Sequence, residues 1–423
     1  MAIELSSITF TEQDDIVPAS GVEEIVNTAI ANTLAGHDII NAKSMFYNIG
    51  IGLENFGTLD MGGGNDIINA EGESRGIANF YVFNTGEGND IINTEGRLSG
   101  IDNSDRFNTG EGNDIITAKG GSWGIDNGVF YNGSYPFSSF NTGDGNDTIE
   151  GAGLYGIFNR NRGLINTGNG KDTIIGNGED PGRGIYNIST IDTGDGDDII
   201  TGNNGFNNYG NINTGDGNDS IIGDKEVFWK SALENYNAIE TGEGNDIITS
   251  TGSIDNKGII NTGNGNDSII TNTGVIYNEG VIETGNGDDS IIVDGGIYDD
   301  ITGTTYGIYN KGGAINMGDG NDSIIANEGF KSAENSSGAW FLGGGEDYIK
   351  GYGSGDFYGG NGNDTLELTP GTYTVGIWGE AGESPVFTKG GQLMITSEFE
   401  KLKAGSTIYD FASLTAGQII VVA

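Results

Sequence analysis

Apolar residues recur at fixed distances from a repeated aspartate along most of the chain. Phe83, Ile191 and Ile282 lie seven residues before such aspartates, and further apolar residues lie two and three residues after them. The apolar runs have the forms Ile-x-Asn, Ile-x-Thr and Asp-x-Ile-Ile, and glycine or asparagine separates them. Short apolar runs between turn residues are typical of buried β-strands, so the spacing predicts coils of three short strands.

The aspartate ends a glycine-rich motif, Gly-x-Gly-x-Asp, which occurs thirteen times between Gly62 and Asp364. An asparagine precedes most of these aspartates by 11 residues, as Asn79 precedes Asp90. The variation in repeat length falls between an aspartate and the next asparagine. This pattern predicts stacked coils with insertions along one edge, and asparagine side chains that hydrogen-bond from coil to coil.

The fold expected from this repeat is all-β: a single elongated parallel β-solenoid (a β-roll or β-helix) with one calcium turn per coil and a small C-terminal β region as a cap. Residues 1–20 are expected to form an N-terminal cap, and residues 21–341 the solenoid, in coils of 21–33 residues. Motifs ending at Asp347, Asp356 and Asp364 are nine and eight residues apart, which predicts a tandem nonapeptide β-roll over 342–366. Residues 367–423 are expected to form the C-terminal cap.

Residues 22–34 fit two patterns. Val22, Ile25, Val26 and Ala29 have the spacing of an amphipathic helix. The pair Asn27 and Asp38, however, repeats the 11-residue spacing of the coils. We therefore expect a degenerate first coil here rather than a helix.

The chain is strongly acidic, with 61 acidic and 18 basic residues and a formal net charge of -43. Such a chain repels itself unless counterions are built into the fold, and it disfavours nucleic acid and anionic membranes as partners. There is no cysteine, so neither disulfides nor thiolate metal sites can form. No run of about 18 apolar residues predicts a membrane span, and residues 1–10 lack the pattern of a cleaved signal peptide.

Each glycine turn combines exposed carbonyl groups with one carboxylate, the hard oxygen donors that calcium prefers. The motif resembles the G-G-x-G-x-D-x-U-x repeats of the RTX family of secreted calcium-binding proteins. The resemblance implies ions held between successive turns, on the order of a dozen in all. The chain departs from the family pattern at the first position, where Thr, Met or Leu usually replaces glycine.

Lys171 lies beside one aspartate and is expected to weaken calcium binding there, whereas His37 replaces a glycine of the turn before Asp38, which is expected to hold no ion. The expected metal ligands are Asp66, Asp90, Asp114, Asp147, Asp172, Asp198, Asp219, Asp246, Asp267, Asp289, Asp322, Asp347, Asp356 and Asp364.

No catalytic cluster is apparent in the sequence, which contains one histidine and no metalloprotease motif, so we do not expect an enzyme. The leading hypothesis is a secreted, calcium-dependent structural protein of a cell surface, matrix or filament, self-assembly being one possible use. The RTX resemblance implies export by a type I system that reads an uncleaved C-terminal signal. The uncharged residues 411–423 fit such a signal.

Two other functions compete with this hypothesis. Aromatic insertions could bind cell-surface glycans, although their packing on one another is an alternative use. Rows of Thr and Asn could bind ice, but Glu87 and Asp144 make the row between the glycines charged, which disfavours that function. The aromatic residues of the insertions include Phe130, Tyr131, Tyr135, Phe137, Phe228, Trp229, Tyr298 and Tyr306.

Overall fold

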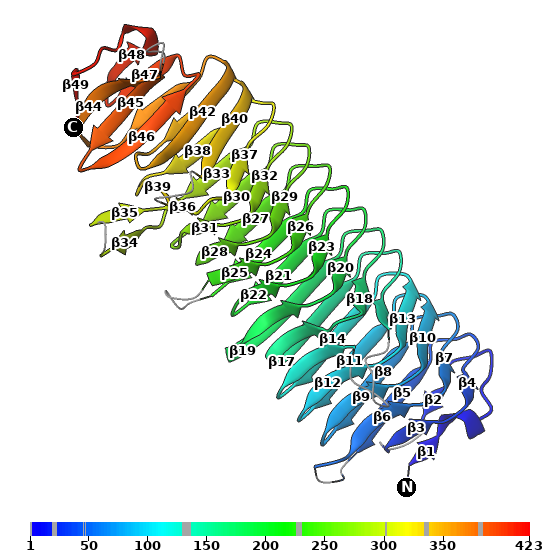
Figure 1. The fold of residues 1–423 in the computed structure, drawn as a ribbon. Helices are drawn as coiled ribbons and strands as arrows, with labels where there is room; N and C mark the ends of the chain where they lie inside the picture. Colours follow the sequence, from blue (N-terminus) through cyan, green and yellow to red (C-terminus); the bar gives the residue numbers. More distant parts are fainter. Residues whose placement is uncertain are drawn as a thin grey trace. The chain divides into compact units, whose positions relative to one another are not determined.

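The computed structural model describes residues 2–18, 23–44, 46, 48–128, 137–225, 231–300, 303–333, 338–379 and 384–423. The chain divides into two compact units, Met1–Asp224 and Lys225–Ala423. In each unit the strands stack in parallel as successive coils of a β-solenoid (Figure 1). The all-β parallel solenoid predicted from the repeat is therefore confirmed.

The first unit is built mostly from short strands, with two long ones, β17 and β19, and one 3-10 turn. Its elements are β1 (Ile3–Glu4), η1 (Leu5–Ser7), β2 (Ile16–Val17), β3 (Ile25–Asn27), β4 (Ile30–Asn32), β5 (Ile39–Ser44), β6 (Ile51–Asn55), β7 (Thr58–Asp60), β8 (Ile67–Gly72), β9 (Arg75–Asn79), β10 (Val82–Glu87), β11 (Ile91–Gly96), β12 (Ser99–Asn103), β13 (Arg106–Glu111), β14 (Ile115–Gly120), β15 (Trp123–Asn127), β16 (Ser138–Asn141), β17 (Thr148–Asn159), β18 (Gly163–Asn166), β19 (Thr173–Asn187), β20 (Thr190–Asp192), β21 (Ile199–Asn203), β22 (Phe206–Asn208), β23 (Asn211–Asn213) and β24 (Ser220–Asp224).

The strands of this unit form three parallel stacks, one for each strand of a coil. β9, β12 and β15 pair in the first stack, β7, β10 and β13 in the second, and β8, β11 and β14 in the third. Equivalent residues of successive coils lie opposite one another, as Ile77 lies opposite Ile101. The three strand types match the predicted Ile-x-Asn, Ile-x-Thr and Asp-x-Ile-Ile runs.

The core is filled by side chains that stack on their counterparts in the next coil. Phe83, Phe107 and Phe140 are fully buried, and their rings stack with centroids 4.4 and 4.6 Å apart. Each buried large apolar side chain contributes about 1.5–3 kcal/mol. Of the two apolar residues expected after each aspartate, Ile291 is fully buried but its neighbour Ile292 is half-buried. Only one of them faces the core, because successive side chains of a strand alternate in direction.

A second internal stack consists of asparagine side chains. Nδ2 of Asn55 donates to Oδ1 of Asn79 at 2.8 Å, and Nδ2 of Asn79 donates to Oδ1 of Asn103 at the same distance. The bonds continue in the first unit to Asn208 and recur in the second unit from Asn235 to Asn310. The predicted asparagine ladder is confirmed, and its amides satisfy polar groups that would otherwise be buried without partners.

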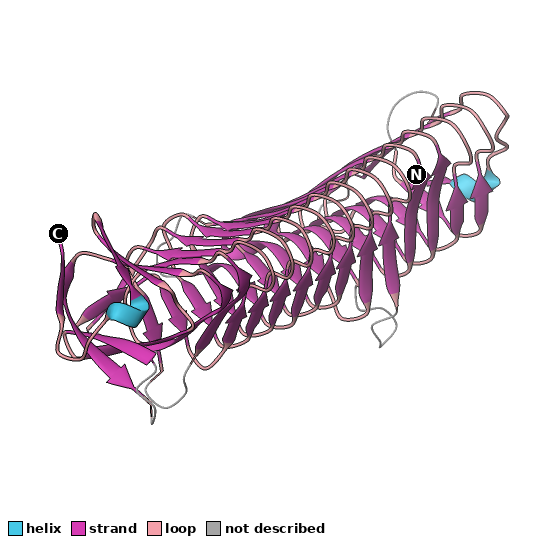
Figure 2. Cartoon of the chain, turned by 90° about the horizontal axis from the view of Figure 1, so that it is seen from above, coloured by secondary structure: helices cyan, strands magenta, loops and turns pink. Residues whose placement is uncertain are grey.

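Part of the first 20 residues, which were expected to form a cap, pairs with strands of the solenoid. β1 pairs with β3 and β2 with β5, both in parallel, so part of the segment 1–20 already lies in the stacks. β3 and β4 occupy 25–27 and 30–32, where the competing pattern allowed a helix. In the described residues, helical structure is limited to the two short turns η1 and η2 (Phe411–Ser413) (Figure 2).

The second unit continues with strands of the same kind and ends in antiparallel pairs. Its elements are β25 (Ser231–Asn235), β26 (Ala238–Glu240), β27 (Ile247–Ser250), β28 (Ser253–Asn256), β29 (Ile259–Asn261), β30 (Ser268–Thr271), β31 (Ile276–Asn278), β32 (Val281–Glu283), β33 (Ser290–Val293), β34 (Ile297–Asp299), β35 (Thr304–Tyr306), β36 (Ile308–Asn310), β37 (Ala314–Asn316), β38 (Ser323–Ala326), β39 (Phe330–Ser332), β40 (Ala339–Gly345), β41 (Tyr348–Lys350), β42 (Gly355–Gly362), β43 (Thr365–Leu368), β44 (Gly371–Trp378), β45 (Ser384–Lys389), β46 (Gln392–Ser397), β47 (Lys401–Ala404), β48 (Thr407–Asp410), η2 (Phe411–Ser413) and β49 (Ile419–Val422).

The expected nonapeptide β-roll over 342–366 takes a different form in the structure. The segment between Asp347 and Asp364 makes one short coil, in which β42 pairs in parallel with β40. Asp356 lies within β42, next to the buried Phe357, and not at a second turn. The ring of Trp340 fills the space beside Gly355, where a Cβ would lie 2.0 Å from it, so the chain passes as a strand.

The C-terminal β region begins later than expected. β46 and β47 still pair in parallel with β42 and β43, so they extend the stacks beyond residue 367. The antiparallel strands β44, β45, β48 and β49 then cover them. A small C-terminal β cap is therefore present, as predicted. None of the helical segments in the described residues has the length and apolar character that a membrane crossing requires.

Candidate metal centre

The glycine turns are packed so closely that only glycine fits at two of their positions. Gly86 and Gly88 have φ angles of 110° and 139°. A Cβ on Gly86 would lie 1.6 Å from the carbonyl oxygen of Gly62, and one on Gly88 would lie 1.7 Å from that of Gly64. The main-chain carbonyl groups of successive turns are thus stacked at one edge of each unit, which explains why the motif requires both glycines.

The aspartate that follows each turn forms a ladder of main-chain contacts. The backbone N–H of Asp66 donates to Oδ1 of Asp90 at 2.8 Å, and that of Asp90 donates to Oδ1 of Asp114 at 2.8 Å. The same bond recurs in the second unit, where the N–H of Asp267 donates to Oδ1 of Asp289 at 2.8 Å. One oxygen of each carboxylate therefore fixes the register of the coils. We call this series the aspartate ladder.

In most members of the aspartate ladder, the second carboxylate oxygen is buried and receives no hydrogen bond. Leaving a polar atom in this state is costly, and for a charged group the cost is several kcal/mol or more. The buried Oδ2 atoms without a donor belong to Asp38, Asp66, Asp90, Asp114, Asp147, Asp172, Asp198, Asp267, Asp289, Asp322, Asp347 and Asp364. A row of such atoms is the arrangement expected where cations belong.

Burial raises the pKa of many of these carboxyl groups well above the ordinary value for aspartate. It raises the pKa of Asp66, Asp147 and Asp322 to about 7. It raises the pKa of Asp90 and Asp289 to about 6, although the hydrogen bond that each carboxylate accepts from a backbone N–H opposes the shift. Without a cation, the ladder would therefore carry protons near neutral pH.

A buried threonine lies five residues before many of the ladder aspartates. The hydroxyl of Thr85 donates to the carbonyl oxygen of Thr109 at 3.0 Å, and Thr262 donates to Thr284 at 3.2 Å in the second unit. These hydroxyl groups link successive coils at the position where the RTX consensus has glycine. The sequence shows that threonine replaces glycine at this position. The hydrogen bond from threonine to the next coil, however, depends on the register of the coils.

The structure brings the predicted ligands together with one exception and one addition. Asp356 lies outside the ladder, because the N–H of Asp347 donates directly to Oδ1 of Asp364 at 2.9 Å. Asp38, expected to belong to a turn without an ion, is buried and in register with Asp66. Lys171 points outward beside the buried Asp172. The remaining predicted ligands are all buried at their turns: Asp66, Asp90, Asp114, Asp147, Asp172, Asp198, Asp219, Asp246, Asp267, Asp289, Asp322, Asp347 and Asp364.

At the turns from Asp66 onward, the donor atoms of the ladder aspartates and of the glycine carbonyl groups are oxygens, which fits calcium better than softer metals. Among the residues that the structure describes, no three carboxylates or imidazoles converge as a metal cluster. An ion at a turn would consequently need main-chain carbonyl oxygens in addition to the ladder carboxylates. Such a mixed donor set is common for calcium, which accepts six to eight oxygens in flexible geometry.

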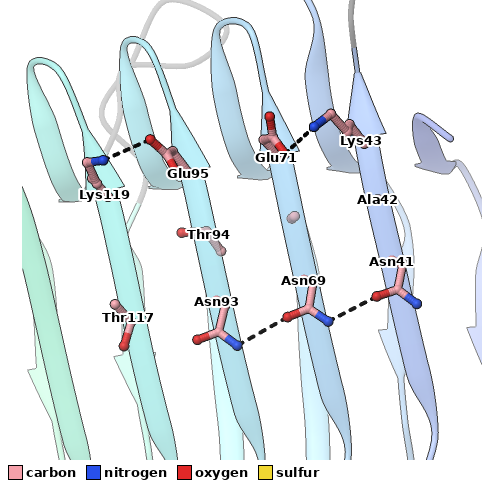
Figure 3. Close-up of a pocket in the computed structure, with 11 residues that line it drawn as sticks. Asn41, Ala42, Lys43, Asn69, Glu71, Asn93, Thr94, Glu95, Thr117 and Lys119 are labelled. Carbon is pink, nitrogen blue, oxygen red and sulfur yellow. Dashed lines mark hydrogen bonds and ion pairs between the residues drawn. The ribbon is translucent and has the colours of Figure 1, made fainter. Parts of the chain in front are cut away.

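The outer face of β5, β8, β11 and β14 carries a shallow groove of about 320 Å³. Its polar side chains already contact one another: Asn69 donates to Asn41, Lys43 pairs with Glu71, and Lys119 pairs with Glu95 (Figure 3). These bonds run from coil to coil, as in the interior. These pairs therefore stabilise the stack of coils. The polar side chains that line the groove contact one another and do not converge on a ligand site.

Aromatic residues of the insertions divide into packed and exposed positions. Tyr306, at the end of the hairpin β34–β35, is buried and contacts the rings of Tyr277 and Tyr309. Tyr298 and Phe137 are exposed, at 62% and 65%. The packing of Tyr306 agrees with insertions that fold back on the solenoid. The other aromatic residues proposed for this role, Phe130, Tyr131, Tyr135, Phe228 and Trp229, lie outside the described residues.

Comparisons with known proteins add little to this description. No protein-family model matches the chain, and no curated protein matches it. One solved structure is similar, the "X-ray crystal structure of a hyperactive, Ca2+-dependent, beta-helical antifreeze protein from an Antarctic bacterium". The match has 16% sequence identity, covers 98% of this chain and 95% of that chain, and has a TM-score of 0.41. This level of similarity transfers neither ligand nor activity to the present chain.

Proposed function

We propose that this protein is a calcium-dependent structural β-solenoid whose coils are held in register by ions bound at the glycine turns. The observation that carries the proposal is the row of buried Oδ2 atoms without donors at the twelve aspartates named above. The net charge of -43 also favours bound cations, because they reduce the repulsion between acidic residues along the whole chain. About a dozen divalent ions would cancel roughly 24 of these charges.

Calcium accounts for these features better than protons do. Protons would neutralise the ladder only below the raised pKa values, which reach about 7 at Asp66. A divalent cation neutralises the carboxylates at higher pH and also coordinates the stacked carbonyl oxygens of the glycine turns. Magnesium fits less well, because it keeps several of its waters and requires near-octahedral geometry.

Dependence on calcium suits a protein that works outside the cell. A chain with this acidic ladder would stay unfolded where calcium is scarce and fold where calcium is abundant. We therefore favour a cell surface, a matrix or a filament as its location, with export of the unfolded chain. The C-terminal residues include η2 and β49 of the cap, so a signal in this region would become folded after export.

The test is a calcium titration of the chelated protein, followed by circular dichroism and by size-exclusion chromatography. We expect a cooperative gain of β-structure together with compaction, and no such change with magnesium at the same concentration. Ion counting on the dialysed protein should give several calcium ions per chain. Stable β-structure in the chelated protein at pH 8, unchanged by calcium, would refute the proposal.

A further inference from the structure

The last ladder aspartate is followed by a segment that keeps the register but has no glycine turn. β43 and β47 pair in parallel, with Thr365 opposite Lys401. Glu400 therefore stands opposite Asp364, at the place of one further ladder aspartate. Leu402 is fully buried opposite Leu366, as the core residues of the repeat are. Residues 400–402 thus continue the pattern with Glu-x-Leu in place of Asp-x-Leu.

Glu400 also makes the main-chain contacts of a ladder residue. The N–H of Asp364 donates to Oε2 of Glu400 at 2.7 Å, as the N–H of Asp347 donates to Oδ1 of Asp364 at 2.9 Å. The N–H of Lys401 donates to the carbonyl oxygen of Asp364 at 2.9 Å, which repeats the bond from Thr365 to Asp347. One carboxylate oxygen of Glu400 thereby fixes the register. Unlike the buried ladder aspartates, Glu400 is exposed, and Oε1 is its second carboxylate oxygen.

The turn before Glu400 explains why a glutamate stands here. Ser397 pairs with Tyr358, so the chain reaches Glu400 in three residues where the repeat takes six to reach Asp364. Glu398 adopts a φ of 62°, and a Cβ on Gly359 would lie 1.9 Å from its carbonyl oxygen. The shorter turn follows a different path, and a side chain one methylene longer than aspartate reaches the N–H of Asp364 from it.

The charged side chains that act most strongly on Asp364 are acidic. The side chain is fully buried, and its Oδ2 receives no hydrogen bond. The carboxylate of Glu400 is the charged group with the largest repulsive effect on this side chain. A buried carboxylate with an unpartnered oxygen, facing a second carboxylate in register, favours a cation between them.

We propose that Glu400 is the terminal cation ligand of the aspartate ladder and holds, together with Asp364, a calcium ion that fastens β47 and the C-terminal cap to the last coil. The inference rests on the proposed function and extends it to a residue outside the repeat. It makes the docking of the cap dependent on calcium. The calcium ligands of this protein would then include a glutamate from the cap itself.

The experiment compares hydrogen–deuterium exchange of the full-length protein, Glu400→Gln and Glu398→Gln across a calcium titration. Glu400→Gln keeps an oxygen that can accept the Asp364 N–H but removes the charge. Glu398→Gln makes the same charge change two residues away, outside the ladder register, and is the matched control. Peptides covering residues 399–410 report on the docking of β47. Peptides covering residues 257–293 report on the folding of the repeat.

We expect Glu400→Gln to raise the calcium concentration for half-protection of 399–410 about tenfold, with the repeat peptides and the Glu398→Gln control unchanged. Equal midpoints for Glu400→Gln and the unaltered protein would overturn the inference. Loss of repeat protection in Glu400→Gln at saturating calcium would also overturn it, because the effect would not be local. If calcium protected no peptide of the unaltered protein, the proposed function itself would fail.

Discussion

The N–H of Asp66 donates to Oδ1 of Asp90, while Oδ2 of Asp90 is buried without a donor. The same carboxylate therefore has two separate tasks. One oxygen aligns successive coils through the main chain, and the other places negative charge where water is excluded. An asparagine could perform the first task but not the second, so substitutions can separate register from charge.

The first prediction uses this separation at Asp267. Asp267→Asn keeps an acceptor for the N–H of Asp246 and removes the charge. We expect the calcium midpoint of folding to rise about three- to tenfold, because a charged calcium ligand is lost. The control is Asp288→Asn, which makes the same change at an exposed carboxylate that accepts the N–H of Asn321. Calcium titrations followed by circular dichroism would contradict the ladder if both variants moved the midpoint equally.

The second prediction concerns pH in the absence of calcium. Burial raises the pKa of Asp66 and Asp147 to about 7 from an ordinary value of 3.8. The folded chain therefore binds protons more tightly than the unfolded chain, so this contribution to stability is complete below about pH 4 and is lost as the pH rises through 6 to 7. The calcium-free solenoid should be more stable at pH 5 than at pH 8.

Thermal unfolding of the calcium-free protein at pH 5, 6.5 and 8, at constant ionic strength, measures this effect. With saturating calcium the trend should weaken or reverse, because protons then compete with the ion for the carboxylates. A melting temperature of the calcium-free protein that rises from pH 5 to pH 8 would contradict the pKa shifts assigned to the ladder.

The aspartate ladder could be predicted from the sequence because its spacing and the chemistry of its residues agree. A solenoid aligns residues that recur at equivalent positions, so Asp90 and Asp114 had to meet once the fold was parallel. Asp356 ends a run one residue shorter than the motif, Gly353-Ser354-Gly355-Asp356, and the bulk of Trp340 beside Gly355 keeps that segment in a strand. A short motif does not contain this information, because it depends on the neighbouring coil.

Glu400 shows the opposite case, a ladder position with no motif to reveal it. Its turn contains no glycine, and only the pairing of Thr365 with Lys401 places it in register. The hairpin β34–β35 was likewise not predictable, since its docking depends on contacts of Tyr306 with the ring of Tyr277 in the preceding coil and with that of Tyr309 in the next strand. Contacts between residues far apart in the sequence determine both features, whereas the repeat can be recognised from residues that are close in the sequence.

The third prediction tests the packing of the glycine turns. Gly88→Ala would place a Cβ 1.7 Å from the carbonyl oxygen of Gly64, at a φ of 139°. We expect a loss of at least about 1–3 kcal/mol from backbone strain alone. Gly63→Ala is the control, because its Cβ would meet nothing nearer than the carbonyl oxygen of Glu87 at 3.9 Å. Urea unfolding in saturating calcium should leave this variant close to the unaltered protein.

If Gly63→Ala and Gly88→Ala were equally destabilised, the close stacking of the turn carbonyls would not be the reason for the second glycine. If neither variant lost stability, the turns would be more open in solution than in the structure. The comparison is informative because the two positions lie in adjacent turns of the first unit and receive the same methyl group.

The last prediction concerns the internal asparagine ladder, which holds the coils together without any metal. Asn103→Ala removes the acceptor of Asn79 Nδ2 and the donor to Asn127 Oδ1, at 2.8 and 2.9 Å, and leaves both partners buried. Because a buried polar group without its partner costs about 1–3 kcal/mol, we expect a loss of at least that size. Asn93→Ala removes a bond of 3.1 Å to Asn69 on the exposed face and should cost less than about 0.5 kcal/mol. Both variants should keep the calcium midpoint of residues 257–293 unchanged, as followed by hydrogen exchange. A shift of that midpoint by Asn103→Ala would mean that the two ladders act as one cooperative system rather than as separate supports of the same coils.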